Sequence, residues 1–281
     1  MRMRSGEIIR FLGKLLAIAM VLAALSTGIR AQNTDALIPD QNAQKARELL
    51  QQTIQALGGQ AYMNLRDSTC QARLSAFGHS GELMGFDTLL EMTKVPDKAR
   101  TEHSKKRNII EVFNGDKGWV LDKGGVAEAP PDQVKAWTDH LKKDIGNVLR
   151  SRISEPGMIL RYAGADVVDL KEVNWVELTD SDDWTIRLAL DSITHVPVRE
   201  VVNSQDPASQ LRTEQIYEFS NYHSISGVQT PFQISASRNG FRVFQEFLDT
   251  CSYNTGLSDS LFTKGSLEER WAQVDKKKLF K

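Results

Sequence analysis

Residues 217–263 read YEFSNYHSISGVQTPFQISASRNGFRVFQEFLDTCSYNTGLSDSLFT. This stretch contains three β-like runs, at 217–222, 229–238 and 241–252, and the dipeptides Ser226-Gly227 and Asn239-Gly240 separate them. Asn-Gly supplies the two positive-φ residues that a tight type I′ hairpin needs, so we expect the last two runs to pair antiparallel. The stretch therefore predicts a β-meander.

The same period of two extends upstream of the meander. Apolar and polar residues alternate in further strand-like runs, and turn residues separate these runs at 68–77, 84–92, 98–102, 108–113, 160–170, 172–179, 184–190 and 196–203. Another run starts at Trp119, after the turn Asn114-Gly115. Given the usual size of sheets, we expect one antiparallel sheet of roughly ten strands.

Helical spacing appears in four places. Apolar residues recur every three to four positions in 43–57, 132–150 and 266–280, and a short helix is expected at 60–65. Gly58-Gly59 ends the first helix as an αL cap would, and Pro130-Pro131 introduces the helix at 132–150. The predicted fold class is therefore α+β.

The first 31 residues are typical of an export signal. Arg2, Arg4, Arg10 and Lys14 precede an apolar run, Leu15–Leu25, that is too short for a stable membrane anchor. We expect cleavage after Ala31, with Gly28 and Ala36 as alternatives, and an uncleaved anchor as the rival interpretation. The remaining chain divides into a linker at 32–42, a domain at 43–265 and a C-terminal helix or tail at 266–281.

Four stretches resemble one known family. The meander has a strand entry with Gly227, Pro231 and Phe232, then a hairpin, then Tyr253-Asn254 and Leu261-Phe262. This order resembles the end of the LolA-like family of periplasmic lipoprotein and lipid carriers. The stretches ALGGQAYMNLRD (56–67), FNGDKGWV (113–120) and, more weakly, DSITHVPVR (191–199) are also similar to family segments. The resemblance implies a strongly curved antiparallel sheet, an incomplete β-barrel, with helices on its concave side.

Cys70 and Cys251 are the two cysteines of the chain. An exported protein meets an oxidising compartment, so a disulfide between the first and last strands is one hypothesis. Two buried free thiols, which behave as small hydrophobic groups, are the other. The sequence leaves both open.

Several functional classes lack support in the sequence. Lys and Arg number 35 against 36 Asp and Glu, so the chain has no basic surplus for nucleic acid. The five histidines have no metal-binding spacing, and the P-loop, G-x-G-x-x-G and C-x-x-C motifs are absent. We interpret the acidic turn at 180–183 as a hairpin turn rather than a cation site. We therefore expect no catalytic, cofactor or metal residues.

The remaining candidate is an apolar surface. In a curved sheet, one face of alternating apolar residues can line a cavity for acyl chains, and each buried methylene contributes about 0.8 kcal/mol. The candidate cavity residues from alternation are Met84, Phe86, Leu90, Met92, Trp184, Ile186, Leu188, Leu190, Phe232 and Ile234. The alternative is that the same residues form a filled core.

Family members shuttle lipoproteins or glycolipids between membranes, or sense them. The resemblance therefore implies a periplasmic, monomeric protein that binds a lipid or an acylated lipoprotein and meets an envelope membrane protein. A structural domain with a filled core is the second hypothesis, and an envelope hydrolase is the third.

Overall fold

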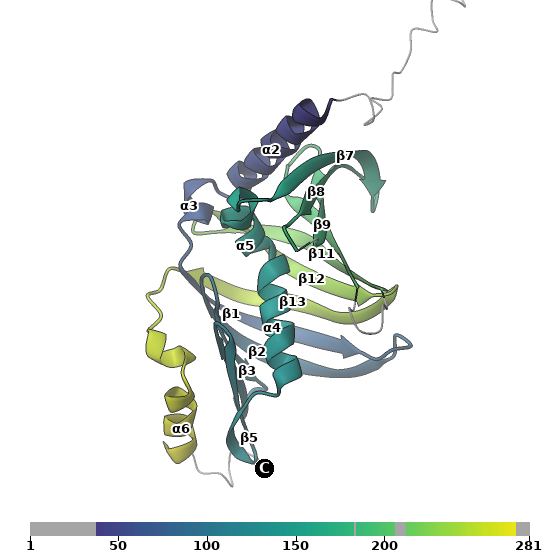
Figure 1. Ribbon diagram of the computed structural model, residues 1–281. Coiled ribbons are helices and arrows are strands. Elements are labelled where there is room, and N and C mark those ends of the chain that lie inside the picture. The colour runs from purple at the N-terminus through teal and green to yellow at the C-terminus, as the bar shows by residue number, and fades with distance from the viewer. Residues whose placement is uncertain (1–37, 183, 206–211, 274–281) are drawn as a thin grey trace, which may run out of the picture. The chain divides into compact units, whose positions relative to one another are not determined.

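The computed structural model describes residues 38–182, 184–205 and 212–273 (Figure 1). The expected signal segment at 1–31 lies outside the described residues. So do most of the expected linker and the end of the expected C-terminal helix, 274–280. Within the described residues, no helix is both long and apolar enough to cross a membrane.

The fold is α+β, and its centre is one antiparallel sheet of thirteen strands that does not close into a barrel. In chain order, the strands are β1 (Asp67–Phe77), β2 (Leu83–Lys94), β3 (Lys98–His103), β4 (Ile109–Asn114), β5 (Lys117–Asp122), β6 (Gly125–Glu128), β7 (Ile159–Val168), β8 (Lys171–Thr179), β9 (Thr185–Asp191), β10 (Pro197–Gln205), β11 (Arg212–Ile225), β12 (Val228–Arg238) and β13 (Phe241–Tyr253). The sequence predicted roughly ten. Four-residue β6 is too short for alternation to reveal.

The strand order is β6-β5-β4-β3-β2-β1-β13-β12-β11-β10-β9-β8-β7. Each strand except β1 and β7 pairs with its predecessor in the chain, so the sheet consists of two meanders that meet where β1 pairs with β13. Cys70 and Cys251 are opposite each other in this pair and form a disulfide. The predicted hairpin is confirmed, because Arg238 pairs with Phe241 around Asn239-Gly240, both at positive φ.

The helices differ in detail from the predicted ones. They are α2 (Pro39–Ala56), α3 (Gln60–Met63), α4 (Pro131–Lys143), α5 (Ile145–Arg150) and α6 (Lys264–Gln273). Helix α2 begins four residues before the expected start, because Pro39 occupies a first-turn position where its missing N–H costs nothing. The predicted helix at 132–150 is two helices. Asp144 leaves the helical conformation (ψ 119°) and its side chain accepts a hydrogen bond from the Asn147 N–H, which caps α5.

Helices cover both faces of the sheet. On the concave face, α2, α3 and α5 pack on β7–β10 and form the first core, with Leu50, Leu149 and Leu188 at its centre. On the opposite face, α6 and the short helix at Asp259–Phe262 pack on β2–β5 and form the second core, with Ile110, Phe262 and Leu267. The terminal helix therefore departs from the expectation that the helices lie on the concave side.

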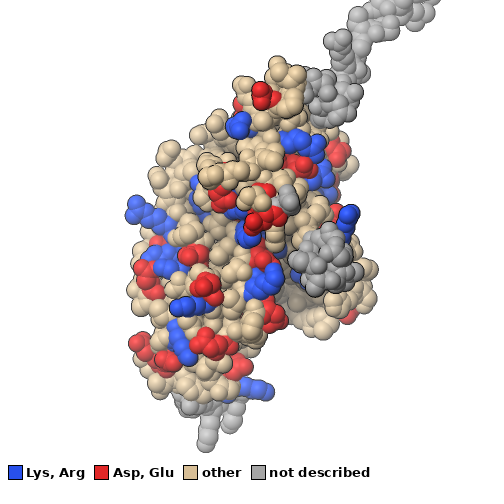
Figure 2. Space-filling model, in the orientation of Figure 1, with Lys and Arg blue, Asp and Glu red and all other residues tan. Residues whose placement is uncertain are grey.

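Charged side chains are mixed over the surface. On the face in Figure 2, positive and negative groups alternate over short distances, as the nearly equal totals of 35 and 36 allow. Many are paired, for example Arg161 with Glu177 at 2.9 Å and Lys142 with Asp182 at 2.9 Å.

Candidate functional site

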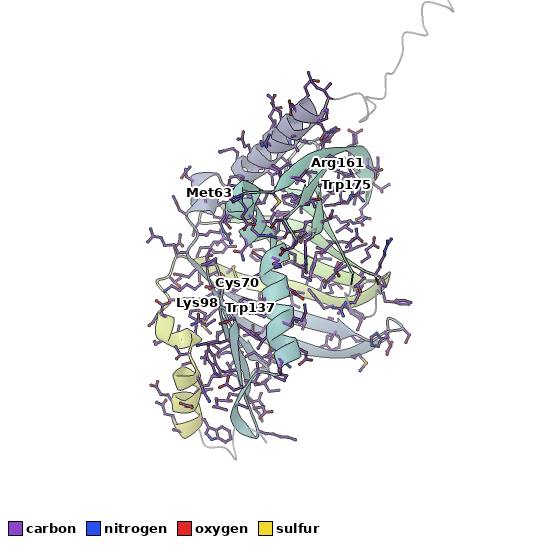
Figure 3. The ribbon with its side chains drawn as sticks, viewed as in Figure 1. Met63, Cys70, Lys98, Trp137, Arg161 and Trp175 are labelled. Atoms are coloured by element: carbon purple, nitrogen blue, oxygen red, sulfur yellow. A yellow bond between two sulfur atoms is a disulfide. The ribbon has the colours of Figure 1, made fainter. Side chains whose placement is uncertain are left out.

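Helix α4 lies across the concave face between the two meanders (Figure 1). The Trp137 ring stacks on Phe113 with 5.3 Å between centroids, and its indole N–H donates to the Gly115 carbonyl at 3.1 Å (Figure 3). At the other end, Lys142 lies 5.5 Å from the centroid of the Trp184 ring on the far meander. None of the α4 residues is fully buried, so α4 spans the sheet without a packed core of its own.

Helix α5 packs into the concave core at the base of α4. Val148 and Leu149 are buried in the concave core, and the Asn147 amide donates to the Pro96 carbonyl at 3.0 Å. This hydrogen bond joins α5 to the turn between β2 and β3. The break at Asp144 therefore lets α5 enter the core while α4 stays above the sheet.

A cavity of about 270 Å³ lies between these helices and the sheet. The helical side contributes Leu57, Tyr62, Trp137, Leu141 and Ile145, and the sheet contributes Phe219, Tyr222, Val228 and Tyr253. Most of these side chains are aliphatic or aromatic. The cavity is therefore suited to an apolar group with a few polar contacts.

Three tyrosines contribute hydroxyl groups to the cavity wall. The Tyr222 hydroxyl donates to the Pro197 carbonyl at 2.6 Å, and the Tyr253 hydroxyl is 2.7 Å from the Thr230 hydroxyl. Burial raises the pKa of Tyr62, Tyr222 and Tyr253, so all three phenols are neutral at physiological pH. They fix the cavity wall without adding charge.

Arg150 brings a positive charge to the wall of the cavity. Its guanidinium lies 5.3 Å from the centroid of the Tyr62 ring, and among the described residues its buried Nε has no hydrogen-bond partner. The Asp144 carboxylate lines the same cavity. The two lysines of the wall are already engaged, because Lys94 and Lys98 contact the Asp259 carboxylate at 3.0 and 2.7 Å. Arg150 is thus placed to meet an anionic end of a ligand.

Three glutamates elsewhere on the concave face are shifted towards the neutral form. Burial, followed by the charge of Glu91, raises the pKa of Glu246 to about 8. Burial also raises the pKa of Glu91, which is hydrogen-bonded to Glu246. Glu200, only 3% exposed, has its pKa raised by burial as well. All three shifts favour the protonated, uncharged form of these carboxyls on the concave face.

A histidine neighbours this glutamate pair. His103 Nδ1 is 2.7 Å from the Asp87 carboxylate, and its Nε2 is 3.7 Å from the Glu111 carboxylate. The nearby Glu111 carboxylate raises the pKa of His103, and burial opposes this change. Among the described residues, no group of three His, Cys, Asp or Glu side chains has a geometry for a metal ion.

The acidic turn is a hairpin turn in the structure. Asp180 Oδ1 accepts hydrogen bonds from the N–H groups of Asp182 and Trp184, and Oδ2 is 2.7 Å from Arg152. Both carboxylate oxygens of Asp180 are therefore occupied by contacts within the fold.

The ten residues selected by alternation do not line the cavity. Ile186, Leu188 and Leu190 lie on the concave face but are fully packed in the core, and Trp184 packs against its edge. Ile234 is half-buried and pairs with Phe219, a cavity residue, while Phe232 packs on His223 at 4.6 Å between centroids. These six of the ten candidate residues therefore belong mainly to the packed core.

The four residues from β2 lie on the opposite face. Leu90 and Met92 belong to the second core, beside Ile110 and Val112, and Met84 and Phe86 are exposed. The expected common cavity face for β2 and β9 is therefore wrong. Both faces of this sheet bury apolar residues, so alternation separates two faces but does not show which one is concave.

The residues that do line the cavity escaped the sequence prediction. Tyr62, Arg150, Tyr222 and Tyr253 come from separate elements, and only the strand register and the break at Asp144 bring them together. One signal was available. Tyr62 and Tyr253 lie within the stretches that resemble the LolA-like family.

The sheet, the concave helices and the cavity define a LolA-like fold. It matches a DUF1329 family protein from Desulfovibrio piger, with a TM-score of 0.59 and 14% identity over 80% of this chain and 99% of the other. It also matches a putative outer membrane lipoprotein-sorting protein domain from Vibrio parahaemolyticus, with a TM-score of 0.54 and 12% identity over 81% and 100%.

A third similar structure is a LolA superfamily protein from Nitrosomonas europaea, with a TM-score of 0.51 and 15% identity over 79% of this chain and 99% of the other. No family model matches the sequence, and no curated protein matches it. At these identities, the likeness concerns the fold.

Proposed function

We propose that this chain is an exported envelope protein that binds an acyl chain or another lipidic ligand in the concave cavity, as a carrier or a sensor. The cavity between α4, α5 and the sheet is the observation that carries the proposal. Somewhat more than half of its wall is aliphatic or aromatic, its phenols are neutral, and Arg150 can meet a carboxylate or phosphate at one end of the ligand. The N-terminal segment at 1–31 supports export, and the name of the Vibrio domain supports a link to lipoproteins.

The size of the cavity limits the ligand. Typical small-molecule sites are roughly 300 to 1,000 Å³, and this cavity of about 270 Å³ is just below that range. It therefore suits a single hydrocarbon chain. A ligand with several acyl chains requires α4 to move away from the sheet.

Native mass spectrometry of the protein purified from its own envelope tests the proposal. We expect a bound lipid, and the variant Leu141→Trp should lose it because the larger side chain fills the cavity. Leu170→Trp is the matched control, since Leu170 is 98% exposed on a turn away from the cavity. Repeated recovery of bare wild-type protein that takes up no fluorescent fatty acid would contradict the proposal.

A second candidate is a non-catalytic structural or interaction domain. It is favoured by the packed half of the concave face, where Ile186, Leu188 and Leu190 fill the space beneath α2 and α5. The same experiment separates the two functions, because a structural domain yields bare protein whether or not position 141 is changed.

A further inference from the structure

Three hairpin turns lie side by side at one edge of the sheet. The neighbouring strands β4-β3-β2-β1-β13-β12 place the β3–β4, β1–β2 and β12–β13 turns on the same edge. We call residues 77–86, 104–109 and 238–242 the turn edge. None of them lines the concave cavity, so the turn edge is separate from the proposed ligand site.

The turn edge exposes large apolar side chains. Phe86 is 78% exposed, Met84 is 69% exposed, and Leu83 and Phe241 are about half exposed. Single exposed apolar residues are ordinary on soluble proteins, but several that cluster at one edge indicate a contact surface. The sheet also places a shallow groove beside Phe86, which Ser104, Lys105 and Phe247 help to line.

The same edge is positively charged. Residues 77–86, 104–109 and 238–242 contain five lysines or arginines, which are Lys105, Lys106, Arg107, Arg238 and Arg242. These ranges contain one carboxylate, Glu82, and Asp87 directly follows the first range. Both are engaged locally, because Glu82 accepts a hydrogen bond from the Ser80 N–H, and Asp87 accepts one from the Ser104 N–H and contacts His103. This local surplus contrasts with the nearly neutral chain as a whole.

Contacts within the edge hold these groups in place. The Arg242 guanidinium lies 6.0 Å from the centroid of the Phe77 ring, and Phe77 pairs with Leu83 across the β1–β2 hairpin. The Ser104 N–H donates to Asp87 at 2.8 Å, which fixes the Lys105-Lys106 turn beside β2. The apolar and basic groups are therefore presented together by a rigid sheet.

We propose that the turn edge docks onto an anionic membrane surface. Exposed aromatic and aliphatic side chains can enter the boundary between head groups and acyl chains, while the surrounding lysines and arginines contact anionic head groups. Charge complementarity favours a lipid surface of this kind over a neutral one. Docking would bring the carrier to a membrane independently of whether its cavity is occupied.

Vesicle co-sedimentation of the full chain tests the docking. The probes are vesicles of phosphatidylglycerol and phosphatidylethanolamine, compared with vesicles of phosphatidylcholine alone. We expect the wild-type protein to sediment with the anionic vesicles and to be released as salt rises. Charge reversal in Lys105→Glu with Lys106→Glu should lower this partition at least about tenfold.

The apolar contribution has a matched control. Met84→Ser with Phe86→Ser should also release the protein from anionic vesicles, and both sites are exposed, so the fold should be kept. Leu170→Ser with Ile193→Ser removes two apolar residues that are even more exposed, from the opposite edge of the sheet, and should leave binding unchanged. A thermal melt of each variant checks folding.

Three results would overturn the docking. They are equal sedimentation with both kinds of vesicle, full binding by both turn-edge variants, and equal loss in the Leu170 and Ile193 control. If the turn edge captured a membrane protein but did not bind bare vesicles, its partner would be a protein and the lipid docking would be wrong. Loss of docking with retention of the co-purifying lipid would leave the proposed function intact.

Discussion

The protonation of Glu246, on the concave face, makes the stability of the fold depend on pH. Burial and the facing Glu91 raise its pKa from an ordinary 4.5 to about 8, so the folded protein holds a proton that the unfolded chain releases near pH 4.5. The resulting stabilisation is complete below about pH 4.5 and is lost as the pH rises towards 8.

The variant Glu246→Gln should remove much of this dependence, because glutamine is neutral at every pH. We expect the melting temperature of the wild-type protein to fall between about pH 5 and pH 9, and that of the variant to fall less. Circular dichroism melts across this range measure the difference. Glu214→Gln, at an exposed position of β11, is the control and should retain the wild-type slope. Parallel slopes for wild type and Glu246→Gln would exclude this role for Glu246.

At the scale of single elements, α4 is attached to the near meander through one aromatic residue. Its residues are all at least partly exposed, and its contact with the near meander rests on Trp137, which stacks on Phe113 and donates to Gly115. Helix α5 differs, because Val148 and Leu149 are buried. The two helices are adjacent in the chain but should differ in local stability.

Trp137→Ala should loosen α4 alone. We expect faster hydrogen exchange of the α4 amides and unchanged protection in α5 and β8, measured by mass spectrometry of peptic fragments. Thr138→Ala, one residue further along α4, controls for a general effect of substitution in this helix. Uniform protection in the variant, or faster exchange throughout the sheet, would show that Trp137 is not the local anchor.

The elements also show where sequence prediction works. Asn239-Gly240 identified its hairpin because the dipeptide itself supplies the required backbone conformations. The break at Asp144 was missed because the apolar period continues through it, from Leu141 to Ile145 and Leu149. What ends α4 there is the need for α5 to enter the core, and that is a property of the tertiary fold.

The described domain has one buried apolar core on the concave face of the sheet and two on the opposite face, one beneath α6 and one over β7–β10. Leu50 is at the centre of the concave core and Phe262 is at the centre of the core beneath α6, and both are essentially inaccessible to solvent. The residue pattern predicted the sheet and the period of its strands, and the resemblance to the LolA-like family implied its curvature. It did not predict the division of its apolar residues between two faces, because a period of two looks the same from either side.

Leu50→Ala and Phe262→Ala should each destabilise the protein strongly and independently. We expect about 2 to 5 kcal/mol for Leu50→Ala and about 3 to 5 kcal/mol for Phe262→Ala, from lost burial and the cavity each leaves. Because the sites share no contacts, the double variant should equal the sum within about 0.5 kcal/mol. Urea denaturation measures all three. A large deviation from additivity would mean that the two cores behave as one.

The pairing of β1 with β13 has a consequence for the order of folding. At the disulfide, these strands join residues that are 181 positions apart in the sequence. The middle of the sheet therefore cannot form until the last strand of the chain is present. The meanders β2–β6 and β7–β12 consist of neighbours in sequence and can form early, whereas their union carries the cost of closing a very long loop. Until β13 arrives, β1 has one flank unpaired, and the sheet stays divided into two unfinished meanders.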